Sequence, residues 1–198
     1  FSSKLKFKID KKVKEAIYEK GYLLSNISNA RLFDEFCKIF LSGMAEKNFN
    51  KLLSYDLNKY LISTESEKNE FTKKLITESL RNTDIRIKNV QSVTPGFLIA
   101  ALLWPELLEK SVMKNEINLR KFFRSMDVVL RKQQKITAIP RKFNSYIKDI
   151  WVLQLKLHSR IGKQPYKTLR HPRFRAAYDL MLIREKSAGV SKHLGKWW

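Results

Sequence analysis

The chain contains 198 residues, 43% of them apolar and 12% aromatic, a content that excludes an intrinsically disordered tail. Its 40 lysine and arginine side chains outnumber the 19 acidic ones and give a formal net charge of +21, which favours nucleic acid as the first partner and an anionic membrane surface as the second. Only six glycines and five prolines interrupt long runs with helical periodicity, so we expect an all-α fold.

Three helical segments are predicted in the N-terminal part of the chain. Asp10 is expected to cap a helix over KKVKEAIYEK, and Gly21 is expected to close it. Ser28 or Asn29 is expected to cap ARLFDEFCKIFLSG, whose apolar residues recur at intervals of three and four and which Gly43 ends. The segment AEKNFNKLLSYDLNKYLIS continues the same periodicity.

The next stretch is more polar. Residues 64–79 carry an apolar stripe of Phe71, Leu75 and Ile76, which predicts a helix with one inner face. The segment RNTDIRIKNVQSVTPG after it has a weak pattern, so we expect part of it to be loop.

A strongly apolar helix is predicted next. Thr94 and Pro95 have the residue types of a helix N-cap and a first helical position, and the buried run FLIAALLW follows them. Pro105 is expected to break or kink this helix or to begin the next one. A bilayer span needs about 20 apolar residues, so this run is too short and no membrane partner is predicted from it.

A long amphipathic helix is predicted from about residue 118 to residue 134. Its inner side is expected to hold Leu119, Phe122, Met126, Val129 and Gln133. On its outer side, four cations fall within about 60° of one another at 100° per residue. These cations form a basic stripe of Arg120, Arg124, Arg131 and Lys135, and Asp127 on the same side reduces its positive charge.

Two more helices complete the prediction. Ile139 and Pro140 are expected to begin the first, and its buried positions are Phe143, Ile147, Ile150, Trp151, Gln154, Leu157 and Ile161. The second is expected to have Pro172 at its first position, and its buried stripe is Phe174, Ala177, Tyr178 and Met181. Arg175 and Asp179 are four residues apart and are expected to pair. Trp197 and Trp198 are expected to pack on the body of the protein.

No metal site or disulfide is predicted. The single cysteine, Cys37, lies among apolar residues, so we expect a buried, inert thiol and a reducing, cytoplasmic setting. The three histidines, at 158, 171 and 193, are scattered along the chain. A zinc site needs clustered ligands, which this spacing does not provide.

The acidic residues do not predict a catalytic centre either. Glu65 and Glu67 are interpreted as the solvated start of a helix, and the side chains of Asp34 and Glu35 diverge by about 100° on theirs. No glycine-rich phosphate-binding loop of the Walker or dinucleotide type is present. We therefore predict no catalytic residue and no cofactor in this chain.

Several segments are familiar when they are taken together. They are FSSKLKFKID, ARLFDEF, FLIAALLWP and, above all, IPRKFNSYIKDIWVLQLKLHSRIGKQPYKTLRHPRFRAAYDLMLIRE with the final KWW. They resemble the bacterial poly(A) polymerases, within the superfamily of tRNA nucleotidyltransferases and poly(A) polymerases. Two positions depart from the family pattern: Lys6 stands where glycine is usual, and Asp34 stands where glutamate is common.

The resemblance implies the multi-helix neck, body and tail arrangement of the class II nucleotidyltransferases. The neck remainder is expected over 1–44, a helical body over 45–114 and a basic helical tail over 115–198. In the family, a preceding head domain carries a Gly-Ser motif and a D-x-D pair, and uses ATP and Mg²⁺ to add AMP to RNA. This chain is expected to begin after that head and to be inactive alone.

The resemblance also assigns roles to two groups of residues. Arg31, Asp34 and Glu35 match the neck motif, which supports the helix that reads the incoming nucleotide. For the tail, it implies binding of a single-stranded RNA 3′ end, and residues 131–198 hold 17 of the 40 basic side chains but only 3 of the 19 acidic ones. The candidates for RNA contact are Arg120, Arg124, Arg131, Lys135, Lys163, Lys167, Arg170, Arg173 and Arg175.

Other interpretations stay open. The basic face is also compatible with docking an acidic protein, with binding DNA, or with solvation alone. A DNA-binding module ranks last because the sequence has no clear helix-turn-helix. Partners implied besides RNA are the missing head domain and a second copy of the chain, since exposed neck residues such as Phe1, Leu5 and Phe7 can drive self-association.

Overall fold

The computed structural model describes residue 5 and residues 7–65, 68–114, 116–190 and 193–198. Regular structure in these ranges is almost entirely helical, which confirms the expected all-α class. The elements are α2 (Lys11–Lys20), η1 (Gly21–Asn26), α3 (Asn29–Phe40), α4 (Ala45–Leu53), η2 (Asn58–Tyr60), α5 (Glu70–Lys88), α6 (Pro95–Ser111), β1 (Val112–Met113), β2 (Glu116–Ile117), α7 (Leu119–Gln134), α8 (Arg141–Lys156), α9 (Gln164–Leu169), α10 (Phe174–Lys186) and α11 (Leu194–Trp197). The strands β1 and β2 form one short antiparallel hairpin.

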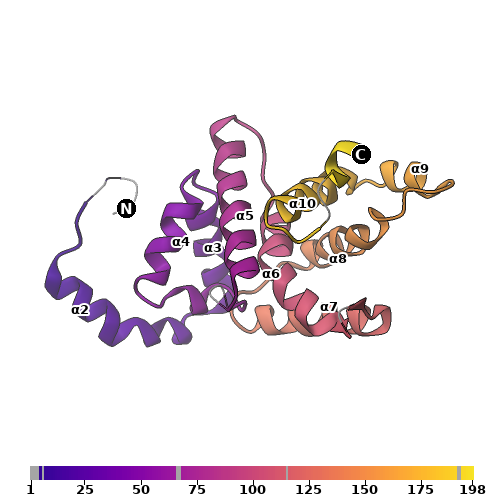
Figure 1. Ribbon diagram of the computed structural model, residues 1–198. Coiled ribbons are helices and arrows are strands. Elements are labelled where there is room, and N and C mark those ends of the chain that lie inside the picture. The colour runs from indigo at the N-terminus through magenta and orange to yellow at the C-terminus, as the bar shows by residue number, and fades with distance from the viewer. Residues whose placement is uncertain (1–4, 6, 66–67, 115, 191–192) are drawn as a thin grey trace.

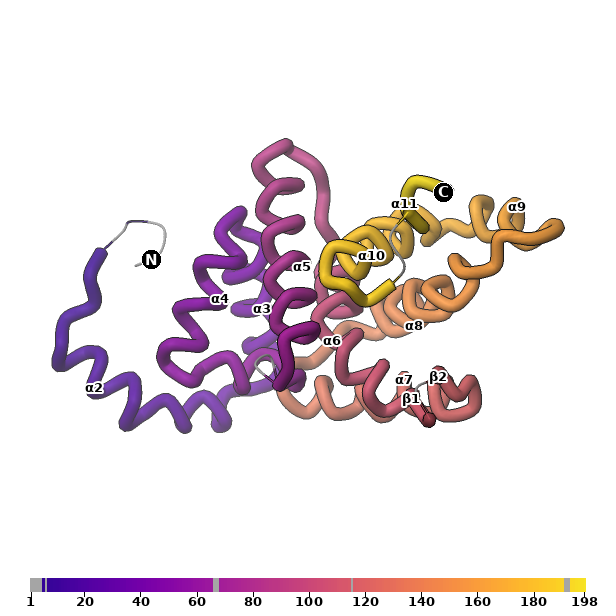
Figure 2. Tube along the Cα trace, in the orientation of Figure 1, coloured from indigo at the N-terminus to yellow at the C-terminus, as the bar shows by residue number. Residues whose placement is uncertain are grey.

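The molecule is elongated, with α2 at one end and α9 at the other (Figure 1). Helices α5 and α6 stand in the middle, and α10 packs against α5 and α8. Figure 2 shows the chain returning at its C-terminal end, through α11, to the side where α10 lies. Among the described residues, none of the helices is long and apolar enough to cross a bilayer.

Helix α6 is the centre of the hydrophobic core. Its residues from Gly96 to Leu107 are all buried, because α5, α7 and α8 pack around it. Thr94 caps it as predicted, with its Oγ1 accepting a hydrogen bond from the backbone N–H of Phe97 at 3.1 Å. Pro105 does not end the helix, which continues to Ser111. One core thus extends from α3 to α10 through a single buried helix.

A buried polar network joins α6 and α7 to the segment before α5. The amide of Gln133 donates to the carbonyl of Leu61 at 2.8 Å and accepts from the backbone N–H of Ser63 at 2.8 Å. The carboxylate of Glu106 accepts from Lys132 at 3.0 Å and from the hydroxyl of Ser63 at 3.1 Å. These bonds explain why a glutamine lies on the inner face of α7, as its spacing predicted, since buried polar groups need partners.

The expectation that part of residues 81–96 is loop is confirmed, since α5 continues to Lys88 and residues 89–94 lie outside the helices. The helical part has a weak apolar pattern because it contains a buried carboxylate. Asp84 accepts hydrogen bonds from the backbone N–H groups of Ala45 at 2.6 Å and Glu46 at 3.1 Å. It therefore satisfies the free donors at the start of α4, a tertiary role that weakens the apolar pattern of α5.

Three expectations about helix ends were wrong. Leu119 is 58% exposed because it is the first residue of α7. Ile161 is 86% exposed because α8 ends at Lys156, before the loop that contains Gly162. The last long helix begins at Phe174, two residues after Pro172, and the short helix α9 precedes it.

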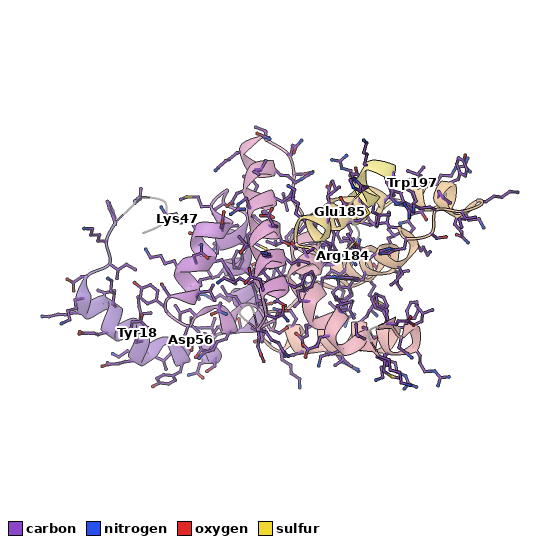
Figure 3. All side chains as sticks on the ribbon, viewed as in Figure 1. Tyr18, Lys47, Asp56, Arg184, Glu185 and Trp197 are labelled. Carbon is purple, nitrogen blue, oxygen red and sulfur yellow. The ribbon has the colours of Figure 1, made fainter. Side chains whose placement is uncertain are left out.

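The buried stripe of α10 is confirmed. Ala177 and Met181 are fully buried, and Phe174 and Tyr178 pack beside them. Trp198 packs on the same cluster, with its ring 5.6 Å from that of Phe174 and its indole N–H bonded to the carbonyl of Leu157 at 2.8 Å. Trp197 instead remains 46% exposed near the C-terminal end (Figure 3).

The N-terminal elements are anchored lightly. Asp10 and Ser28 cap α2 and α3 as predicted. No residue of α2 is buried, and the hydroxyl of Tyr18 attaches the helix to the carbonyl of Ser54 at 2.7 Å (Figure 3). Leu5 and Phe7, expected to be exposed, are 48% and 65% exposed, while Phe1 lies outside the described residues.

Candidate nucleic-acid interface

The predicted basic stripe lies on the solvent side of α7. Asn118 starts the helix by accepting a hydrogen bond from the backbone N–H of Lys121 at 3.0 Å, and Phe122 and Val129 fix the inner face by full burial. The opposite face carries Arg120, Arg124, Arg131 and Lys135, all exposed. Within the described residues none of these four makes an ion pair, so their charges are available to an external anion.

Asp127 reduces the charge of this face less than its position alone predicted. Its carboxylate accepts from Lys148 of α8 at 2.6 Å, and both side chains are at least one-third exposed. Lys132, at the edge of the same helix, is engaged with Glu106. The four cations of the basic stripe therefore stay available to a ligand, as does Lys121, which is exposed on α7 outside the stripe.

A second group of cations lies around α9. Lys163, Lys167 and Arg170 are all exposed on this short helix and its flanks. Figure 1 places α9 at the end of the molecule, beyond α8 and away from α7. The structure therefore does not bring all nine candidates into one row, but separates the basic stripe from the α9 cations.

Arg173 and Arg175 form a third place, at the start of α10. The Cζ atom of Arg173 lies 4.8 Å from the centre of the Tyr146 ring on α8. Arg175 donates through Nε to Asp179 at 3.2 Å, which confirms the predicted pair, and Asp179 also accepts from Arg86 of α5 at 3.2 Å. Burial raises the pKa of Asp179, whereas the two arginines oppose that rise.

Sequence reasoning missed Arg86 and Tyr146 in this place. Arg86 lies in the weakly patterned segment that was expected to be partly loop, and Tyr146 lies between the predicted buried positions of α8. Neither has a local motif that marks it, since Arg86 reaches Asp179 and Tyr146 reaches Arg173 only through the packing of α10 on α5 and α8.

The neck-motif residues lie on α3. Arg31 and Asp34 are exposed, and Glu35 accepts from Lys38 at 2.8 Å.

Cys37 on the same helix is half-buried, and burial, with a smaller effect of Asp34, raises the pKa of its thiol. This thiol is therefore protonated and unreactive at neutral pH. In the ranges that the structure describes, histidine, cysteine and carboxylate side chains do not gather in groups of three able to hold a metal ion.

Two family models match the chain. Residues 114–198 match the family described as the polymerase A arginine-rich C-terminus, and this range contains all nine candidate cations. Residues 6–65 match the family described as the probable RNA and SrmB-binding site of polymerase A, and this range contains the neck motif.

Similar full-length proteins carry the name poly(A) polymerase I. The protein of Haemophilus influenzae is 36% identical over 209 residues, which cover 100% of this chain and 46% of that protein. The protein of Escherichia coli O157:H7 is 36% identical over 212 residues, and that of Salmonella typhi is 34% identical over 209 residues, each covered to 45%. The chain spans less than half the length of these curated relatives. With both matches and this similarity along its whole length, the chain belongs to the bacterial poly(A) polymerase family.

Proposed function

We propose that this chain holds single-stranded RNA for a bacterial poly(A) polymerase, keeping the RNA 3′ end in reach while another part of the protein adds AMP. The observation that carries the proposal is the basic stripe of α7, whose four exposed cations have no ion-pair partner among the described residues. The family description of residues 6–65 names RNA and supports the choice of RNA over other polyanions, while the family that covers the stripe is described by its arginine content alone.

The proposed mode of binding follows from the chemistry of the stripe. Arginine and lysine side chains neutralise phosphates, and a contact to a phosphate does not distinguish one base from another. An enzyme that extends many different RNA ends needs this kind of contact. The binding free energy then comes largely from released counterions and falls steeply with salt.

The proposal divides the work between parts of the whole polymerase. The head domain would supply the catalytic carboxylates and would bind ATP and Mg²⁺, while Arg31, Asp34 and Glu35 would support the helix that reads the nucleotide. This chain alone would then add no AMP. Incubation with RNA, ATP and Mg²⁺ tests that statement, and labelled adenylate appearing on the RNA would contradict it.

The RNA-holding role is tested by fluorescence anisotropy with a labelled oligo(A). Affinity should fall by orders of magnitude between about 50 and 300 mM salt, because each phosphate contact releases counterions. Replacing Arg120 and Arg124 with alanine should weaken binding and flatten this dependence. The matched control replaces Lys73 and Arg81 of α5, two exposed cations outside both matched ranges. Salt-independent binding, or equal losses in both double variants, would contradict the role.

A second candidate function is protein docking on the N-terminal elements. Phe7, Val13, Tyr22 and Leu23 are between 44% and 65% exposed on or beside α2 and η1, and the family description for this range names SrmB besides RNA. Purified SrmB, the head domain and a second copy of the chain are the occupants to compare. Substituting Val13 and Tyr22 with serine should abolish the binding of whichever one docks there, as measured by analytical ultracentrifugation.

A further inference from the structure

A pocket of about 200 Å³ opens where the start of α10 meets α8 and the loop between α5 and α6. Its charged lining consists of Arg86, Arg173, Arg175 and Asp179, and its aromatic wall includes Tyr146. Three guanidinium groups face one carboxylate, so the pocket keeps an excess of two positive charges. These side chains come from three helices that are distant in the sequence, and this pocket exists only in the folded chain.

Arg173 is prepared to bind an anion. Its guanidinium lies over the Tyr146 ring at 4.8 Å, and the Tyr146 hydroxyl accepts a hydrogen bond from Thr94 at 3.2 Å. Stacking covers one face of a guanidinium and leaves the N–H donors along its edge. Among the described residues no acceptor or carboxylate contacts those donors. Arg173 thus presents a planar set of donors in a fixed orientation.

The other two arginines are only partly neutralised. The Oδ2 atom of Asp179 accepts from Nη1 of Arg86, and its Oδ1 atom accepts from Nε of Arg175, each at 3.2 Å. One carboxylate therefore serves two guanidinium groups. Arg86 also donates to the carbonyl of Ser92 at 3.4 Å, which orients it without changing its charge. Each arginine keeps donors for a further acceptor.

We propose that the pocket formed by Arg86, Tyr146 and Arg173 binds one phosphodiester group of single-stranded RNA, an inference that rests on the proposed function. A phosphate offers two oxygens with the spacing of the guanidinium fork and a negative charge that the pocket lacks. Arg173 is the direct contact, Arg86 is the second cation, and Tyr146 is a positioning residue that keeps Arg173 in place.

The shape of the pocket favours the RNA backbone over a base. Pockets for drug-sized ligands are about 300–1,000 Å³, so 200 Å³ suits a phosphate with part of its sugar and not a whole nucleotide. The Tyr146 ring that a base would stack on already carries Arg173. Lys167 and Arg170, both exposed, precede the pocket residue Arg173 in the chain.

The test compares single variants of the chain by oligo(A) anisotropy across a salt series. Arg173→Ala should bind about tenfold more weakly, the loss expected for one hydrogen bond to a charged group. Its slope of log affinity against log salt should fall by about 0.7, the value for one phosphate contact on a single strand. Arg173→Lys should recover the slope but only part of the affinity, because it restores the charge and not the fork.

Two matched controls separate position from charge and from folding. Arg81→Ala removes the same charge from an exposed arginine of α5 that pairs with Glu46 and Glu78, so it should leave the slope unchanged. Tyr146→Leu should lower affinity with Arg173 still present, and Tyr146→Phe, which keeps the ring, should restore it. Thermal unfolding of each variant identifies any loss caused by misfolding, and a Tyr146→Phe variant that folds but does not recover affinity would contradict the positioning role.

The outcomes distinguish the pocket from the proposed function. A wild-type chain that binds oligo(A) with steep salt dependence, with Arg173→Ala equal to Arg81→Ala, would overturn the pocket and leave the RNA-holding role intact. A wild-type chain that does not bind oligo(A) would overturn both. An acidic occupant is checked with poly-glutamate: binding lost in Arg173→Ala, with RNA binding unchanged, would assign the pocket to a protein and reject the proposal.

Discussion

The guanidinium of Arg184 lies 4.4 Å from the centre of the Trp104 ring, and both side chains are buried at the contact between α10 and α6. Figure 3 shows Arg184 toward the middle of the molecule. Its Nη1 donates to Gln154 at 2.9 Å, and no carboxylate pairs with it within the described residues. Burial lowers its pKa to about 9, which still leaves the side chain charged at neutral pH.

This contact predicts an order of stabilities for Arg184 variants. Arg184→Ala should lower the free energy of unfolding by about 3 kcal/mol, because it opens a cavity and removes the donor to Gln154. Arg184→Met should cost less, since an apolar side chain of similar length fills the space and carries no charge to desolvate. Urea unfolding measures both, and a methionine variant no more stable than the alanine variant would contradict the packing contribution of this side chain.

A second prediction concerns the carboxylate that joins α5 to α4. Asp84→Ala should lower the free energy of unfolding by about 2 kcal/mol, because it leaves the buried N–H groups of Ala45 and Glu46 without an acceptor. The stability of Asp84→Asn should lie between those of the wild type and Asp84→Ala, since its single amide oxygen replaces only one of the two carboxylate oxygens that accept from these N–H groups. Urea unfolding tests this order, provided that the unfolding free energy of all three proteins depends on urea concentration with the same slope. Equal stability of Asp84→Ala and wild type would refute the capping role.

A third prediction separates packing from RNA contact at the start of α10. Phe174→Ala should destabilise the chain by about 2 kcal/mol, because the ring packs on Tyr178 and Trp198, and should leave oligo(A) binding nearly unchanged. Arg170→Ala should do the reverse, since an exposed substitution typically changes stability by less than about 0.5 kcal/mol. Thermal melting and anisotropy on the same samples provide both readouts, and the opposite pattern would reverse the two roles.

A fourth prediction uses the raised pKa of Asp179. A carboxyl group whose pKa is higher in the folded than in the unfolded state binds its proton first in the folded state, so its effect on stability becomes more favourable as pH falls through the folded pKa. Relative to Asp179→Asn, the wild-type chain should therefore gain stability between neutral and mildly acidic pH. Urea unfolding of both proteins along this range measures the difference, and an unchanged or opposite difference would contradict the raised pKa.

The same substitution should also strengthen RNA binding. Asp179→Asn removes the carboxylate that Arg86 and Arg175 share, which leaves both guanidinium groups free for a phosphate. We expect higher oligo(A) affinity at neutral pH and a steeper salt dependence. Weaker binding in a folded variant would mean that Asp179 is needed to orient the two arginines.

Local patterns predicted most of the helices and one of the three basic surfaces. Asp10 and Thr94 were recognised as caps because a cap depends on neighbours within three residues. The basic stripe of α7 was also predicted, because residues on one helix face are related by a fixed angle and need no knowledge of the fold. The same argument identified Ala177 and Met181 as buried.

Tertiary packing decided the rest. The sequence by itself determined that this protein is helical, strongly basic and related to the poly(A) polymerases. It did not reveal that Asp84 caps another helix, that Arg86 pairs with Asp179, or that Tyr146 lies under Arg173, because these partners are 39, 93 and 27 residues apart in the sequence. Only when α5, α8 and α10 pack together does the excess positive charge become a pocket with a defined shape.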